Sequence, residues 1–158
     1  MSETQEKIVS ISLDESSIKT RSLEAEHERV VAITDLLHDN QFEALCMLCG
    51  PYDVKLSIKD NRLCFDIHSA STGKSTELAL AIQPLRGIIR DYFMICESYY
   101  EALKKMAGPS RIEAIDMGRR GIHNEGSEIL TSMLEGRIRI NLQTARRLFT
   151  LICVLHIK

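Results

Sequence analysis

The chain has 158 residues, a formal net charge of −2 and 44% hydrophobic residues, a composition typical of one globular domain. The balanced charge and the absence of Trp argue against a nucleic-acid-binding surface, and no apolar run reaches the ~20 residues of a membrane-spanning helix. We therefore expect a single domain over residues 1–158, with residues 1–6 frayed, in a soluble cytoplasmic protein. The five cysteines are expected to be reduced thiols, with Cys96 and Cys153 in the core.

The first half of the chain shows mainly strand patterns. Val9, Ile11 and Leu13 alternate with serines, which predicts a short strand with one buried face. A helix should follow and end near residues 39–40. Residues 52–59 and 62–68 both alternate apolar and polar side chains around Asp60-Asn61, which predicts a β-hairpin, and residues 76–82 extend it by a third strand.

The second half is helical. A long helix should begin at Pro84, bury a stripe that runs to Leu103 and Met106, and end at residues 108–109. A second helix is predicted over residues 110–135, and a short extended piece over residues 137–140. Asn141 can cap the last helix, residues 142–156, which is apolar nearly all round from Leu148 on and therefore buried.

Strands and helices are thus segregated along the chain. This order predicts an α+β fold: an antiparallel β-meander of three strands, joined by an N-terminal strand, and packed with about four helices, of which three are C-terminal. One face of the sheet is polar and can stay open to water or to another subunit.

The helix over residues 110–135 carries the best candidate site. Gly118 and Gly126 lie on its apolar stripe, and their cost to the helix suggests that a neighbouring backbone approaches closely. Another face is polar. The candidate ligand-binding residues on this polar region are Asp116, Arg119, Arg120, His123, Asn124 and Glu125.

These polar residues have both a functional and a structural interpretation. Arg119 or Arg120 can clamp a carboxylate or phosphate in bidentate fashion, and Asp116 can orient Arg120 one turn away. His123 can act as an acid or base near neutral pH. The alternative is a solvated helix face with a simple Asp116–Arg120 pair.

Arg146 and Arg147 precede the most apolar run of the chain and therefore need partners. Structural ion pairing is the interpretation we favour for them. The candidate acidic partners are Asp91, Glu97, Asp116 and Glu125.

Two other motifs give weaker evidence of a functional site. Cys46 and Cys49, with Cys64 and His68, invite a zinc site, but Cys64 and His68 on one extended strand would lie about 13 Å apart, too far to share one ion. The loop of residues 71–76 resembles the end of a phosphate-binding loop, yet the required glycine is replaced by His68 and a strand follows. We therefore expect no metal and no cofactor.

Several runs together resemble a known family. They are residues 26–29, 50–52, 91–102, 112–128 and 144–156. They are similar to uncharacterised protein family 0262, short proteins found mainly in alphaproteobacteria. The resemblance implies a bacterial, cytoplasmic protein and brings no assigned activity, so no catalytic role follows from it.

Three functional hypotheses remain. The first is a non-catalytic binding or regulatory protein that holds a small anion or a partner protein on the polar face of helix 110–135. The second is an enzyme with His123 as acid/base and Arg120 as anion clamp. The third is an obligate homodimer joined through the glycine stripe or the last helix.

Overall fold

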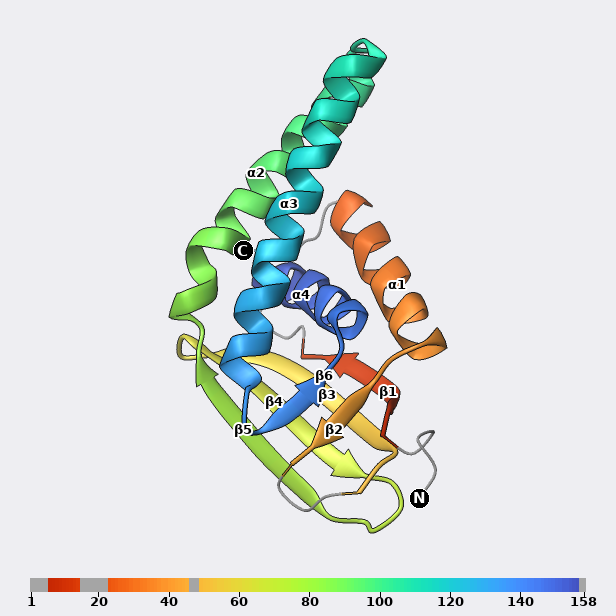
Figure 1. Cartoon of the computed structure of the whole chain (residues 1–158), viewed down its shortest axis with the longest axis vertical. Helices are drawn as coiled ribbons and strands as arrows, with labels where there is room; N and C mark the ends of the chain where they lie inside the picture. The colour runs from red at the N-terminus through yellow and green to blue at the C-terminus, as the bar shows by residue number, and fades with distance from the viewer. Residues whose placement is uncertain (1–5, 15–22, 46–48, 157–158) are drawn as a thin grey trace.

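The computed structural model describes residues 6–14, 23–45 and 49–156, except for the side chains of residues 23–25. Its main sheet has the strand order β1–β3–β4–β5. The strands are β1 (Ile8–Leu13), β3 (Tyr52–Lys59), β4 (Arg62–Ser69) and β5 (Ser75–Ala81). Figure 1 shows this sheet at the lower end of the molecule.

The predicted meander is confirmed, but the sheet as a whole is mixed. β3, β4 and β5 pair antiparallel, and the turn residues Asp60 and Asn61 have φ values of 53° and 63°, as a tight hairpin turn requires. β1, in contrast, pairs parallel to β3, so the prediction of a purely antiparallel sheet was wrong. The physical reason is that helix α1 lies between β1 and β3 in sequence, and a crossover of this kind returns the chain in the same direction.

The N-terminal strand also differs from its predicted pattern. A bulge between Ile8 and Ser10 shifts its register, so Ile8 is buried and Val9 is 44% exposed. Glu6, which we placed in the frayed end, accepts hydrogen bonds from the Phe42 N–H and the Tyr52 hydroxyl at 2.9 and 3.0 Å.

A second, two-stranded sheet joins distant parts of the chain. β2 (Phe42–Ala44) pairs antiparallel with β6 (Ile138–Ile140), which is the extended piece expected near residues 137–140. β2 was not predicted, because a strand of three residues is too short to show a period.

The helices are α1 (Leu23–His38), α2 (Gln83–Lys104), α3 (Pro109–Leu134) and α4 (Leu142–His156). The predicted cap of α4 is confirmed, since the Thr144 N–H donates to Asn141 Oδ1 at 2.9 Å. α4 is buried from Leu148 to Leu155 and lies at the centre, against α1, α3 and the main sheet (Figure 1). None of the described helices is both long enough and apolar enough to cross a membrane.

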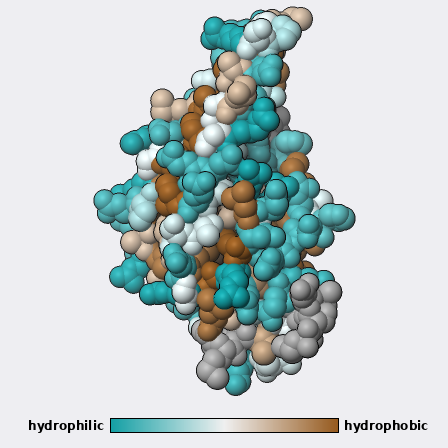
Figure 2. All heavy atoms as spheres, in the orientation of Figure 1, coloured by the Kyte–Doolittle hydropathy of each residue, from teal (hydrophilic) through white to brown (hydrophobic). Residues whose placement is uncertain are grey.

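Helices α2 and α3 form a hairpin whose far end projects beyond the rest of the molecule (Figure 1). Leu103 and Met106 near this end are 43% and 88% exposed, so the predicted buried stripe of α2 stops short of them. The apolar stripe continues in the sequence to these residues, but the rest of the protein does not extend far enough to cover them. On the face shown in Figure 2, apolar side chains are interspersed among hydrophilic ones.

Gly126 is buried where α3 meets α4, and the group beside it is a side chain. A Cβ at this position would lie 2.3 Å from Cζ of Phe149. The expectation that a neighbouring backbone approaches the glycines was therefore wrong. At Gly118 a Cβ would make only an ordinary contact, 3.5 Å from Ile95 Cδ1.

Candidate functional site

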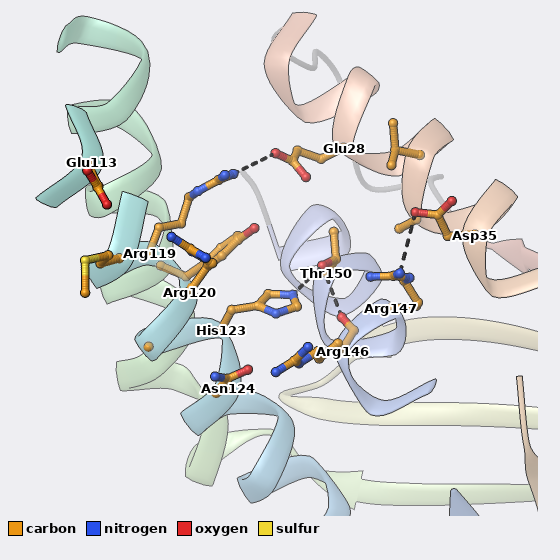
Figure 3. Close-up of a pocket in the computed structure, with 15 residues that line it drawn as sticks. Glu28, Asp35, Glu113, Arg119, Arg120, His123, Asn124, Arg146, Arg147 and Thr150 are labelled. Carbon is orange, nitrogen blue, oxygen red and sulfur yellow. Dashed lines mark hydrogen bonds and ion pairs between the residues drawn. The ribbon is translucent and has the colours of Figure 1, made fainter. Parts of the chain in front are cut away.

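A pocket of about 820 Å³ lies between α1, α3 and α4, with Tyr92 of α2 contributing to its wall. Figure 3 shows how the three helices direct polar side chains into this space: α1 and α3 form opposite sides and α4 lies between them. Its volume lies within the usual range of small-molecule sites, roughly 300–1,000 Å³.

Helical spacing explains how each helix supplies its share. Glu28, Val31 and Asp35 recur at intervals of three and four residues, so they share one face of α1. On α4, Thr150 follows Arg146 by one turn, which places both on the side that faces the pocket.

Arg119 connects three helices rather than facing free space. Its Nη2 lies 2.7 Å from Asp116 Oδ1, its Nη1 lies 3.6 Å from Glu28 on α1, and its guanidinium stacks 4.6 Å from the ring centre of Tyr99 on α2. Burial alone would lower the pKa of Arg119, but the hydrogen bond to Asp116 and the electrostatic interactions with Tyr92, Asp116 and Cys96 together outweigh it, so the pKa is raised. Arg119 is therefore held as a structural cross-link.

Arg120 and Arg147 are held more loosely. Arg120 is 65% exposed at its side chain and contacts Asp116 Oδ2 through Nε at 3.2 Å, which confirms the predicted Asp116–Arg120 pair. Arg147 lies 3.7 Å from Asp35 Oδ2, beyond normal hydrogen-bond distance. Both guanidinium groups therefore keep N–H donors that a ligand can use.

Arg146 has a different environment from the other arginines. Its Nε is buried and has no hydrogen-bond partner among the described residues. In Figure 3 its guanidinium extends toward His123 and Asn124 on α3. The prediction that structural ion pairs account for both Arg146 and Arg147 was thus wrong for Arg146, and Arg147 pairs with Asp35 on α1 instead of with any of the four predicted carboxylates.

His123 is held in a neutral form. The Thr150 hydroxyl donates to the Arg146 carbonyl at 3.1 Å, so its oxygen accepts the hydrogen bond from His123 Nε2 at 2.7 Å. Burial, and then the positive charges of Arg146, Arg147 and Arg119, lower the pKa of His123 to about 4. An acid–base group that works at neutral pH needs a pKa near 7, so this environment counts against the hypothesis that His123 is a catalytic acid or base.

The structure brings together most of the residues that the sequence singled out on α3. Arg119, Arg120, His123 and Asn124 line the pocket, and Asp116 holds two of these arginines in place. Glu125 is exposed and does not line it.

Sequence reasoning missed the contributions of α1 and α4 to the pocket. Glu28 and Asp35 gave no signal, because an acidic residue on a helix is most often solvated surface. Thr150 gave none either, since its role depends on a contact with His123, 27 positions away.

No group of three or more His, Cys, Asp or Glu in the described part of the chain could hold a metal ion. Cys64 and His68 do lie on one strand, β4, and His68 Nδ1 is 2.7 Å from Ser75 Oγ. Cys46 lies outside the described residues, so its pairing with Cys49 is not described. The loop before β5 leads into a strand, without the helix of a phosphate-binding loop.

Comparison with known proteins identifies close relatives. The sequence model of "Uncharacterised protein family (UPF0262)" matches residues 5–158. A UPF0262 protein of Caulobacter vibrioides is 54% identical over 150 residues, covering 95% of this chain and 92% of the relative. One from Roseobacter denitrificans is 51% identical over 155 residues (95% and 97%), and one from Paramagnetospirillum magneticum is 49% identical over 154 residues (98% of both). No solved structure shows significant similarity to the chain.

Proposed function

Since the chain belongs to the UPF0262 family, whose name states no activity, we propose a function from the pocket itself: this is a non-catalytic binding or regulatory protein that holds a small anion between α1, α3 and α4. The observation that carries the proposal concerns Arg146. Its side chain is charged, and its buried Nε–H donor has no hydrogen-bond acceptor among the described residues.

A buried donor without an acceptor destabilises the folded state by about 1–3 kcal/mol, and more when the group is charged. In addition, Arg119 and Arg147 add positive charge to the surroundings of Arg146. A bound anion would supply the missing acceptor and reduce this repulsion. The folded protein should therefore be more stable with an anion in the pocket than without one.

Further donors converge on the same space. The terminal nitrogens of Arg120, the loosely paired Arg147 and the Asn124 side-chain amide all line the pocket. Guanidinium groups are well matched to carboxylate and phosphate oxygens, which they bind in a bidentate manner.

The test measures whether anions stabilise the protein through Arg146. Sodium salts of acetate and phosphate are added at constant ionic strength, with chloride as reference, and the unfolding midpoint is followed by circular dichroism. Wild type should be stabilised by at least one of the two anions, because a ligand that binds only the folded state raises its stability. Arg146→Met should lose this response.

Arg111→Met is the matched control, because Arg111 is exposed on α3 and does not line the pocket. It should respond as wild type does. A response that persists in Arg146→Met, or no response to either anion in wild type, would contradict the proposal. Native mass spectrometry of the freshly purified protein complements this test by detecting a ligand or a partner protein that copurifies.

A further inference from the structure

The distribution of charge and apolar surface within the pocket restricts the class of anion. This inference rests on the proposed function and adds to it the chemical nature of the ligand. Three features carry it: the number of opposing charges, their positions in the pocket, and two exposed apolar side chains on its walls.

The pocket carries little net charge. Its four arginines are opposed by the carboxylates of Glu28, Asp35 and Glu113, which line it, and of Asp116 just behind, while His123 is neutral. Asp116, Glu28 and Asp35 pair with Arg119, Arg120 and Arg147, so Arg146 is the pocket arginine to which the described residues offer no carboxylate. A ligand with one negative charge therefore balances Arg146, whereas a phosphate monoester, which carries about −1.5 to −2 at pH 7, overcompensates it.

The charges are also separated in space. In Figure 3, Glu28 and Glu113 lie on the side toward the projecting hairpin, while Arg146 and Asn124 lie on the opposite side. Arg119 and Arg120 also lie toward the hairpin side, but they are paired with Glu28 and Asp116, so an anionic group is favoured at the Arg146 end. A ligand with negative groups at both ends would place one of them near Glu28 and Glu113, where like charges repel.

The walls offer apolar surface that the protein leaves uncovered. Val31 on α1 is 40% exposed, Met117 on α3 is 60% exposed, and both line the pocket. Each is a side chain whose burial by a ligand would be favourable. Methionine also adapts to ligands of different shape, since it is flexible and polarizable.

We propose that the ligand is an amphiphilic monocarboxylate, with its carboxylate bound by Arg146 and Asn124 and its apolar body covering Val31 and Met117. The planar carboxylate matches the planar guanidinium of Arg146 and supplies the acceptor that its buried Nε does not find among the described residues. The carboxylates of Glu28 and Glu113 disfavour a second anionic group on the opposite side of the pocket.

Isothermal titration calorimetry with four probes tests this: hexanoate, acetate, hexanol and hexyl phosphate. Hexanoate should bind at least about tenfold more tightly than acetate, because each buried methylene contributes about fourfold in affinity. It should also bind more tightly than hexanol and hexyl phosphate, and Arg146→Met should lose hexanoate binding.

Met117→Gln tests the apolar wall with little change in volume. It should weaken hexanoate binding severalfold and leave acetate binding unchanged. Met94→Gln is the matched control, since Met94 is 61% exposed on α2 and does not line the pocket. This control should bind hexanoate as wild type does.

The outcomes separate this inference from the proposed function. Binding of hexyl phosphate as tight as hexanoate, or of acetate as tight as hexanoate, would overturn the monocarboxylate class while Arg146-dependent anion binding still stood. Absence of hexanoate binding at millimolar concentration would overturn it too. If no anion binds through Arg146, the proposed function itself fails.

Discussion

In the free protein, the guanidinium of Arg146 has a buried Nε to which none of the described residues offers an acceptor, and it shares its pocket with three other arginines. A residue with these properties contributes little to folding, and proteins often retain such groups for function at the expense of stability. Arg119 is the opposite case, because Asp116 and Glu28 balance its charge. The two arginines should therefore respond differently to the same substitution.

We predict that Arg146→Met raises the free energy of unfolding of the ligand-free protein by about 1 kcal/mol, since it removes an unsatisfied donor and a repelled charge. Arg119→Met should lower it by about 1–2 kcal/mol, because two partly exposed carboxylates each lose one of their partners. Urea unfolding followed by circular dichroism measures both. Equal destabilisation by the two substitutions would mean that Arg146 is a structural residue like Arg119.

His123 gives a prediction about pH. Its pKa is about 4 in the folded protein and about 6.5 in an unfolded chain, so below pH 6.5 the unfolded state takes up a proton that the folded state does not. The contribution of His123 to stability is therefore unaffected above pH 6.5 and becomes unfavourable as the pH falls toward 4, by at most about 3 kcal/mol.

His123→Gln, which cannot titrate, should consequently gain stability relative to wild type as the pH is lowered from 7 to 4.5. His27→Gln is the control, because His27 is exposed on α1 and does not line the pocket. Urea unfolding at several pH values gives the difference between each variant and wild type. A difference for His123→Gln that is independent of pH would show that His123 protonates readily in the folded protein.

At the scale of the element, the contact between α3 and α4 depends on the absence of a side chain at Gly126. The ring of Phe149 occupies that space and is itself fixed, since it is fully buried and packs edge-on against Tyr92 and His123 at 5.7 and 5.5 Å. The packing of Phe149 against Gly126 explains why a glycine is buried on α3 without any contact to a second subunit. The glycine stripe was one of the two surfaces that we considered for a homodimer. The homodimer stays a prediction.

Gly126→Ala should therefore lower the free energy of unfolding by about 1–3 kcal/mol, because the ring cannot shift without disturbing its neighbours. Gly87→Ala on α2 is the matched control: a Cβ there meets no atom within 4 Å, and the change should raise stability by about 0.5–1 kcal/mol. Thermal unfolding compares the two. Equal effects would contradict the tight packing of Phe149 against α3.

Helices and strands that show a local sequence pattern could be predicted from the sequence. The elements with which they pair or pack could not. The hairpin of β3 and β4 follows from alternation and from two turn residues that tolerate positive φ. The direction of β1 and the existence of β2 depend on pairing with residues far away in sequence, so no local pattern encodes them.

The same division holds for the pocket. The polar face of α3 was visible in the sequence, whereas the residues that α1 and α4 add to it become apparent only when the three helices are packed together. Arg146 was recognised as a residue in need of a partner. That its Nε has no acceptor in the part of the chain that the structure describes could be learned only from the structure.

At the scale of the whole molecule, burial is uneven. α4 is buried without interruption from Leu148 to Leu155, whereas in the far part of the α2–α3 hairpin, residues 98–118, Ala102 is the one fully buried residue. Two contacts with Glu28 join this region to α1: one from the Tyr100 hydroxyl at 3.2 Å, within the far part, and one from Arg119 at 3.6 Å, directly at its border. Local opening needs little energy where few apolar side chains are buried.

Hydrogen exchange followed by mass spectrometry should therefore show fast exchange in residues 98–118 and the slowest exchange in α4. The near parts of the same helices, residues 85–92 and 126–134, serve as internal controls and should exchange more slowly than the far part, because they contain most of the buried residues of α2 and α3. Glu28→Gln should accelerate exchange in the far part alone, since it weakens the contacts that join this part to α1. Uniform protection along both helices would instead mean that the hairpin opens only together with the core, as one cooperative unit.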